Sequence, residues 1–310
     1  MDYRVLGRTG LRVSVLGQGG AAFGQQYGAV SPDEVSACVR HAIDRGVNLF
    51  DTAAYYGKGV SEERLGAALA GGLREKVFIC TKACRLDRAL FDFTADGTRA
   101  CVEASLKRLR TDHVDILLAH DIEFADDYDF VFNETYRELE RLKQEGKTRF
   151  IGMSCYPLPL LKRAIETCEL DAVISYAHFT LQNTRLVSEF LPAAEARGVG
   201  VMNASPLSLG LLTSQGPQAW HPAGADVRAA CKAAAELCAA RGADISDLGM
   251  RFALAEARIP TTLSGAARAS ELDANLNALS APPDPALLVD VLKVLDPVRD
   301  ATWPCGNWKG

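Results

Sequence analysis

Residues 49–57 read Leu49-Phe50-Asp51-Thr52-Ala53-Ala54-Tyr55-Tyr56-Gly57. A short apolar run is typical of a buried strand; here an acid ends the run, and a tyrosine follows the acid by five residues. Gly57 allows the backbone to turn into residues 61–70, which have a helical pattern. We therefore predict a strand that ends near Asp51 and leads into a turn that carries Tyr56.

The next two apolar runs also end in side chains that can assist proton transfer. Residues 77–82 end in Lys82, and residues 114–120 end in His120. A tyrosine exchanges protons poorly at neutral pH because its unperturbed pKa is about 10, and a nearby cation lowers that pKa. If the three strands are neighbours, Lys82 supplies the cation and should lower the pKa of Tyr56 towards the working range. Asp51 would hold Lys82 charged, and His120 would hydrogen-bond the substrate oxygen.

Strands and helices alternate along most of the chain, which predicts an α/β fold in a single domain over residues 1–310. We expect strands at 15–21, 48–53, 77–83, 114–120, 148–154, 172–176, 200–205 and 260–265. Helical patterns cover 32–45, 62–70, 95–108, 131–145, 159–167 and 185–196, with no helix expected between the last two strands. Residues 3–14 read as a hairpin, and residues 208–225 as one long loop. Eight such strands favour a closed (β/α)8 TIM barrel, with an open doubly wound sheet as the alternative.

Parallel barrel strands place their carboxyl ends on one face, where barrel enzymes have their active sites. Taken singly, Asp51 could cap a turn, Tyr56 could pack, Lys82 could be solvated, and His120 could be structural. Their common position at strand ends favours a joint functional role. A tyrosine acting as acid or base beside an oxygen suits interconversion of a carbonyl and an alcohol, which needs a hydride carrier that no side chain provides.

Composition excludes several other classes of function. The net charge of −5, without a basic run, argues against nucleic acid as a partner. No apolar stretch reaches the roughly 18 residues that a membrane span needs, and the first residues lack an apolar signal-peptide core. The nine cysteines form no C-x-x-C pair and no cluster of metal-ligand spacing. We therefore expect a cytoplasmic protein without a metal site.

The stretch Asp51-Thr52-Ala53-x-x-Tyr56-Gly57, together with Lys82 in Thr81-Lys82-Ala83 and with His120, resembles the catalytic tetrad of the aldo-keto reductases. Further stretches resemble the subgroup that oxidises L-galactose, at 120–124, 142–152, 204–207, 215–217, 220–223 and 302–304. The resemblance implies a barrel whose bottom is closed by the amino-terminal hairpin, with a nicotinamide cofactor across the carboxyl-end rim. It also implies a small sugar as partner, whose anomeric hydroxyl is oxidised to a lactone.

The resemblance also assigns cofactor-binding positions. Ser154 matches a contact to the carboxamide, Ser205 and Leu207 match the pyrophosphate loop, and Gly265 and Asn275 match the adenosine end. Three positions depart from the usual pattern of the family. Ser175, also expected to bind the cofactor, replaces the usual glutamine, Cys155 replaces the usual asparagine, and Ala204 stands where many relatives stack a tyrosine on the nicotinamide.

The choice between NAD and NADP depends on residues 263–271, where NADP-using relatives carry two or more basic residues. This chain has only Arg268 there, followed by Glu271. The extra phosphate of NADP needs positive partners at close range. NAD is therefore the expected cofactor, with NADP possible if Arg268 turns towards the phosphate.

Candidate walls of the substrate pocket are Phe23, Tyr55 and Trp220, each of which could equally be packing. The stretch Gly17-x-Gly19-x-x-Ala22 resembles a dinucleotide fingerprint, but a lone match is weak evidence. Two alternative functions stay open at this point. One is an NADPH-linked reductase of small aldehydes, and the other is a cofactor-sensing regulatory subunit.

Overall fold

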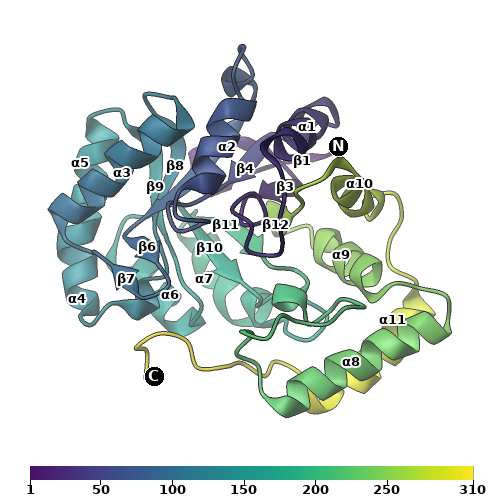
Figure 1. Ribbon diagram of the computed structural model, residues 1–310. Coiled ribbons are helices and arrows are strands. Elements are labelled where there is room, and N and C mark those ends of the chain that lie inside the picture. Colours follow the sequence, from purple (N-terminus) through teal and green to yellow (C-terminus); the bar gives the residue numbers. More distant parts are fainter. Residues whose placement is uncertain (310) are drawn as a thin grey trace.

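Eight parallel strands close into a barrel at the centre of the molecule, and helices surround them (Figure 1). The structure is a computed structural model that describes residues 1–309. Around the barrel the strands are β3 (Leu16–Gly19), β4 (Leu49–Asp51), β5 (Phe78–Ala83), β8 (Val114–Ala119), β9 (Thr148–Ser154), β10 (Ala172–Tyr176), β11 (Gly200–Ala204) and β12 (Thr261–Gly265). β12 pairs with β3, with Leu263 opposite Gly17, so the sheet has no free edge. The predicted TIM barrel is confirmed, and the open-sheet alternative is wrong.

Both faces of the barrel strands are buried, which explains why they read as continuous apolar runs. Side chains that point inwards form a cluster of Leu49, Cys80, Ile116, Leu118, Ala172, Ile174, Met202 and Leu263. Their sequence neighbours point outwards; Phe50, Ile79 and Leu117, for example, belong to the core that the surrounding helices share. Burial on both faces fixes the register of each strand and therefore the height at which its last side chain reaches the rim.

The helices after the first six strands lie close to their predicted positions. They are α1 (Pro32–Asp44), α2 (Val60–Ala68), α3 (Ala95–Leu109), α4 (Tyr128–Phe130) continuing into α5 (Tyr136–Gln144), α6 (Leu158–Thr167) and α7 (Leu191–Ala196). π-helical turns at Val131–Thr135 and Leu186–Phe190 precede α5 and α7. Ser31 begins α1 with a capping box, in which its Oγ accepts from Glu34 N–H at 3.2 Å and the Glu34 carboxylate accepts from Ser31 N–H at 2.8 Å.

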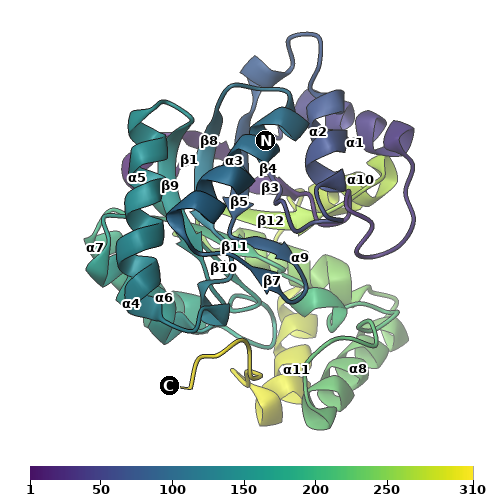
Figure 2. The ribbon, with the colours of Figure 1, turned by 60° about the vertical axis from the view of Figure 1, so that its left-hand side comes forward.

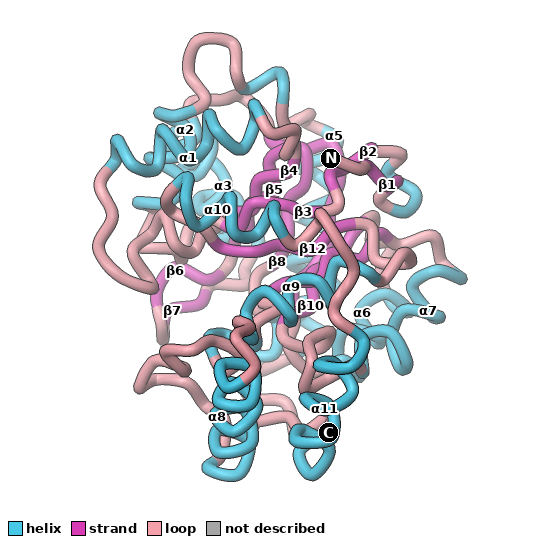
Figure 3. The backbone as a smooth tube through the Cα atoms, turned by 90° about the vertical axis from the view of Figure 1, so that its right-hand side faces the viewer, coloured by secondary structure: helices cyan, strands magenta, loops and turns pink. Residues whose placement is uncertain are grey.

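Four further helices lie in the last third of the chain, where the sequence pattern had indicated none. They are α8 (Ala225–Ala240), α9 (Ile245–Ala255), α10 (Ala269–Asn277) and α11 (Pro285–Leu295). The expectation of no helix between the last two strands is therefore wrong, because α8 and α9 both lie there. α8 is rich in alanine, a strong helix former that blurs the contrast between apolar and polar faces. α8 and α11 pack side by side at the edge of the barrel (Figures 1 and 3) and share buried residues such as Cys231 and Val291.

Two short hairpins lie at opposite ends of the barrel (Figure 3). The strands β1 (Tyr3–Val5) and β2 (Arg12–Ser14) form the predicted amino-terminal hairpin, and Leu6, Leu11 and Val13 pack onto the inward-pointing cluster. Arg8 N–H donates to Gly198 O at 2.6 Å, just before β11 begins, so this hairpin covers the amino ends of the strands. The second hairpin, β6 (Arg85–Asp87) with β7 (Leu90–Phe91), follows β5 at the carboxyl end.

Gly7 in the first hairpin is required by close contact. Its φ is +49°, and a Cβ at this position would lie 2.3 Å from Gly200 N.

Among residues 1–309 no helix is both long and apolar enough to cross a membrane.

Candidate active site

The carboxyl ends of the strands surround a pocket of about 560 Å³. Its wall includes nine residues that the sequence had singled out, namely Asp51, Tyr55, Tyr56, Lys82, His120, Ser154, Ala204, Ser205 and Trp220. Asp51 ends β4, Lys82 lies near the end of β5, and His120 directly follows β8. Because β4, β5 and β8 are adjacent in the barrel, the ends of three strands that are far apart in sequence meet at one part of the rim.

Lys82 is the centre of a buried hydrogen-bond network. Its side chain is 2% exposed, and Nζ donates to both carboxylate oxygens of Asp51, at 2.6 and 2.7 Å. Nζ also lies 2.9 Å from Thr52 O and 3.1 Å from the hydroxyl of Tyr56. A buried ammonium with this many acceptors is held in one position, so it faces the Tyr56 hydroxyl as a fixed charge.

The ion pair between Lys82 and Asp51 keeps the ammonium charged. Burial is the largest single influence and lowers the pKa of Lys82, but the Asp51 carboxylate, together with Tyr56 and Cys80, more than offsets burial and raises that pKa. Burial raises the pKa of Asp51, and the Lys82 ammonium opposes this change. Contacts below 2.8 Å to both carboxylate oxygens favour the charged pair. Asp51 therefore holds Lys82 charged and oriented, as the sequence predicted.

The pKa of Tyr56 differs from the sequence-based expectation. Burial raises this pKa above the ordinary value of a phenol, and the opposing effect of Lys82 is smaller. The expectation that Lys82 brings the pKa of Tyr56 below its ordinary value is therefore wrong for the protein without ligands. The sequence identified the cation, but it gave no measure of how deeply the phenol is buried. In this state Tyr56 is protonated at neutral pH, and Lys82 reduces the cost of removing the proton.

His120 lies edge-on to Tyr56, with ring centroids 5.7 Å apart and an interplanar angle of 86°. Burial lowers the pKa of His120 to about 3, so its imidazole is neutral at physiological pH. Nδ1 is buried and has no hydrogen-bond partner among residues 1–309, and Nε2 lies 3.5 Å from Asp121 Oδ2. A neutral imidazole can donate one hydrogen bond to a substrate oxygen without competing with Tyr56 as a strong acid.

The residues that the resemblance assigned to a cofactor lie along the same rim. Ser154 and Ser205 line the pocket, and Ala204 joins them. Leu207, Gly265 and Asn275 do not line the pocket: Leu207 lies in the loop after β11, Gly265 ends β12, and Asn275 is on α10.

The loop after β11 has the features of a phosphate cradle. Ser205, Ser208 and Leu209 have positive φ values of 55°, 51° and 54°. Left-handed residues of this kind form concave groups of N–H donors that bind anions. The Ser208 hydroxyl is buried and has no partner among residues 1–309. The loop at the predicted pyrophosphate position therefore fits the anionic part of a nicotinamide dinucleotide.

Two positions near the predicted nicotinamide site point elsewhere. Ser175 is fully buried, and its Oγ lies 3.3 Å from Nδ1 of His178, outside the pocket lining. Cys155 is also buried, with Sγ 3.5 Å from Pro157 O. Ser154 Oγ accepts a 3.0 Å hydrogen bond from Asp121 N–H. Of these three residues, only Ser154, the position predicted to contact the carboxamide, lines the pocket.

Arg268 is held by acidic partners at the start of α10. Its Nε donates to Glu34 at 2.8 Å, Nη1 to Glu271 at 3.1 Å, and Nη2 to Ala29 O at 3.0 Å. Glu271 also accepts from the backbone N–H of Ala267 at 2.8 Å. A carboxylate therefore occupies the N–H groups at the beginning of this helix, where an anionic ligand would otherwise be favoured.

The predicted substrate walls are partly correct. Tyr55 and Trp220 line the pocket, and Trp220 is 47% exposed at its mouth. Phe23 is wrong as a wall, because its side chain is fully buried in the core and does not line the pocket. Sequence reasoning assigned no pocket role to several other lining residues, most of which lie outside the barrel strands: Gln26, Tyr27, Arg85, Arg88, Asp121, Phe124, Tyr176, Leu209, Pro222, Trp303, Pro304, Cys305 and Gly306.

The segment after α11 forms one wall of the pocket, as the chain turns back from α11 towards the barrel (Figure 2). Trp303 stacks on Tyr156 at a centroid distance of 4.9 Å. The Asn307 amide donates to Phe124 O and to Asp126 Oδ1, each at 3.0 Å. The only sequence signal for this wall was the resemblance at residues 302–304.

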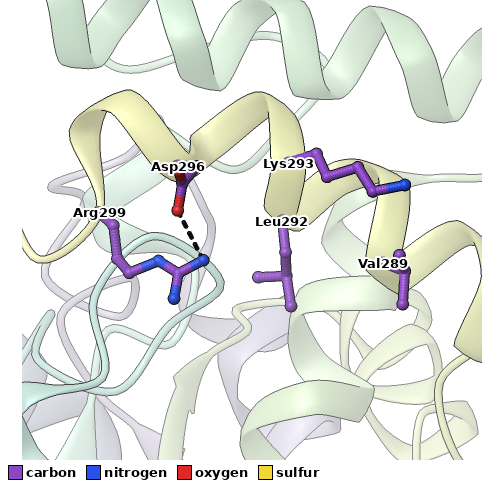
Figure 4. A pocket seen from close by; sticks show the side chains of 5 residues that line it. All are labelled: Val289, Leu292, Lys293, Asp296 and Arg299. Carbon is purple, nitrogen blue, oxygen red and sulfur yellow. Dashed lines mark ion pairs between the residues drawn. The ribbon is translucent and has the colours of Figure 1, made fainter.

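A second hollow, of about 360 Å³, lies along α11 (Figure 4). Val289, Leu292, Lys293, Asp296 and Arg299 line it, and Arg299 pairs with Asp296 at 2.7 Å. Its five lining residues form no buried hydrogen-bond network like the one around Lys82.

Comparisons with known proteins identify the family. Residues 15–287 match the sequence profile of the aldo/keto reductase family. The chain is 39% identical to L-galactose dehydrogenase of Arabidopsis thaliana over 99% of this chain and 98% of that protein. It is 34% identical to D-arabinose 1-dehydrogenase of Saccharomyces cerevisiae, over 79% and 76% of the two chains. An aldo-keto reductase from Bacillus halodurans, solved in its holo form, shares the fold with a TM-score of 0.80 at 24% identity, over 99% of this chain and all of that one.

Proposed function

Because the chain belongs to the aldo/keto reductase family, it is an NAD(P)-dependent oxidoreductase. We propose that it uses NAD to oxidise the anomeric hydroxyl of an aldose, which gives the lactone. The proposed substrate is L-galactose or a sugar of similar stereochemistry. The observation that carries the proposal is the position of Lys82 Nζ, bonded to Asp51 and 3.1 Å from the Tyr56 hydroxyl on the pocket wall. Identity of 39% over nearly the whole length of a sugar dehydrogenase supports the substrate class.

The proposed chemistry divides the work among four side chains. Tyr56 takes the proton of the substrate hydroxyl, and Lys82 stabilises the phenolate that this requires. Asp51 keeps Lys82 charged at 2.6 Å. The neutral His120 donates a hydrogen bond to the substrate oxygen and orients it towards Tyr56. When bound, the nicotinamide ring supplies the hydride acceptor.

The cofactor is proposed to lie along the rim from Ser154 to α10. Ser154 would bind the carboxamide, Ser205 and Leu207 the pyrophosphate, and Gly265 and Asn275 the adenosine. At Gly265 even a Cβ would meet no atom closer than 3.9 Å, which leaves the backbone open to approach. Ser175 was also predicted to contact the nicotinamide, and its bond to His178 makes it the weakest of these assignments.

NAD is proposed over NADP because Arg268 already binds Glu34 and Glu271. The extra phosphate carries between one and two negative charges and would have to displace two carboxylates to gain one partner. Glu271 would remain near that phosphate through its hydrogen bond to Ala267 N–H. NAD meets no such repulsion.

A panel of aldoses, mixed with the purified protein and NAD, tests the proposal. Reduced nicotinamide should form with L-galactose or a sugar of the same configuration, and a lactone should be recovered. A second assay mixes the same protein with NADPH and small aldehydes and measures oxidation of the cofactor. Turnover confined to that second assay would refute sugar oxidation, and absence of turnover in both would refute the enzymatic role.

A further inference from the structure

We propose that Asp121 and Arg85 recognise the substrate hydroxyl on the carbon next to the reacting carbon. This inference rests on the proposed oxidation of an aldose and goes beyond it, because it names what selects the sugar. Neither residue belongs to the proton relay of Asp51, Lys82 and Tyr56, yet both line the same pocket.

The backbone of Asp121 is held in a conformation that few side chains adopt. Its φ and ψ are 51° and 56°, in the left-handed region, which aspartate tolerates better than most residues. The 3.0 Å hydrogen bond from Asp121 N–H to Ser154 Oγ fixes this turn. Conformations of this kind cluster where a side chain must be aimed at a ligand. Here the turn places a carboxylate that is 7% exposed on the pocket wall beside His120.

Arg85 approaches the same carboxylate from β6. Its Nη1 donates to Asp121 Oδ2, and its guanidinium carbon lies 3.9 Å from the centre of the Tyr55 ring. Phe91 and Phe124 flank it at 5.2 and 5.0 Å. Nε is buried and has no hydrogen-bond partner among residues 1–309. Aromatic rings on several sides hold the guanidinium plane in place, so the pair is a rigid arrangement of donors and acceptors.

The charges around the pocket favour a neutral substrate rich in hydroxyls. Lys82 is balanced by Asp51, and Arg85 by Asp121. His120 is neutral, and Arg88 lies on the exposed rim, where solvent screens its charge. An anionic substrate would therefore find no unbalanced cation inside the pocket. A sugar hydroxyl can donate to the carboxylate and accept from the guanidinium without disturbing that balance.

The geometry places this pair one hydroxyl away from the reacting oxygen. His120 Nε2 lies 3.5 Å from Asp121 Oδ2, and we assign the hydrogen bond to the reacting oxygen to this nitrogen. Hydroxyl oxygens on adjacent sugar carbons are separated by a similar, hydrogen-bond-like distance. A substrate with one hydroxyl at His120 and Tyr56 thus has the Asp121 carboxylate beside it, and the hydroxyl on the next carbon is the group we assign to that carboxylate.

The test compares the aldose that the wild-type protein oxidises best with its 2-deoxy and 6-deoxy forms. In the wild-type protein, loss of the 2-hydroxyl should reduce kcat/KM about 10²-fold, as expected for a hydrogen bond to a charged group. In Asp121→Ala this penalty should fall to about threefold or less, while the 6-deoxy penalty stays unchanged. Asp121→Asn keeps one acceptor oxygen and should recover part of the selectivity. Asp87→Ala, in the same hairpin as Arg85 but outside the pocket lining, should behave as wild type.

Thermal unfolding and binding of reduced nicotinamide establish that each variant is folded. If Asp121→Ala does not fold, Arg85→Met gives the same comparison and should likewise reduce the 2-deoxy penalty. If removal of the 2-hydroxyl lowers kcat/KM as much in the folded variants as in the wild-type protein, the inference is overturned, even if sugar oxidation itself is observed. If the wild-type protein oxidises no aldose, the proposed function is refuted instead.

Discussion

Replacement of Lys82 by methionine removes the one buried cation that faces the Tyr56 hydroxyl. The two groups are 3.1 Å apart. At an effective dielectric constant of about 20, a unit charge at that distance is worth about 5 kcal/mol, which equals about 4 pKa units of phenolate stabilisation. Asp51 opposes part of this effect while it is charged, and its carboxyl will take up a proton once its buried partner is lost. We therefore expect oxidation near neutral pH to fall about 10³-fold or more.

The assay is the pH profile of aldose oxidation, followed by nicotinamide absorbance from about pH 6 to about pH 10, around the ordinary range for a phenol. In Lys82→Met the rise of the rate with pH should be displaced to higher pH than in the wild-type protein, because the phenolate of Tyr56 has lost its neighbouring cation. Asp51→Asn should show a smaller shift in the same direction. Lys58→Met is the matched control, because Lys58 lies in the turn after Tyr56 but is 73% exposed and pairs with Asp87. A profile that scales down without moving along the pH axis would refute the electrostatic role of Lys82.

Three further predictions use other parts of the structure. Tyr56→Phe should lower kcat by about 10²–10⁴-fold and leave nicotinamide binding nearly intact; activity within about twofold of wild type would exclude Tyr56 as the proton-transferring group. Steady-state kinetics on one sugar should give a kcat/KM at least about tenfold higher with NAD than with NADP. Glu34→Gln together with Glu271→Gln should narrow that gap by freeing Arg268, and equal use of both cofactors by the wild-type protein would contradict this reasoning. Burial raises the pKa of Glu123 to about 8, so its folded form keeps a proton that the unfolded chain loses above about pH 4.5. Stability should therefore decline as pH rises from about 5 to about 8, by up to about 1.4 kcal/mol per pH unit from this group, and Glu123→Gln should flatten the decline in chemical unfolding experiments.

The barrel strands and the proton relay could be predicted from sequence because burial leaves a strong pattern there. A strand buried on both faces reads as an apolar run, and a polar residue at its end, such as Lys82 or His120, stands out. The strand bounds agree with the predictions to within three residues at every end. The common rim then follows from the geometry of parallel strands.

The rest of the pocket could not be predicted because its walls come from loops without a period. An aromatic residue in a turn gives no sign of its direction, which is why Tyr55 faces the pocket while Phe23 is buried in the core. Arg85 lies on a short hairpin after β5, and Trp303 lies beyond α11, so only the folded chain brings them together. The pKa of Tyr56 was misjudged for a related reason, since the sequence identifies a charged partner but not the loss of water around the phenol.

The two hairpins at opposite ends of the barrel divide the molecule into parts with separate tasks. The β1–β2 hairpin seals the amino end through Leu6 and Val13, and no residue from it lines the reaction pocket. The β6–β7 hairpin contributes Arg85 to the pocket wall. A combinatorial library limited to residues 86–91 would therefore vary the entrance of the site while the sealed end preserves the scaffold. New sugar preferences can be sought in such a library without a search for compensating mutations in the core.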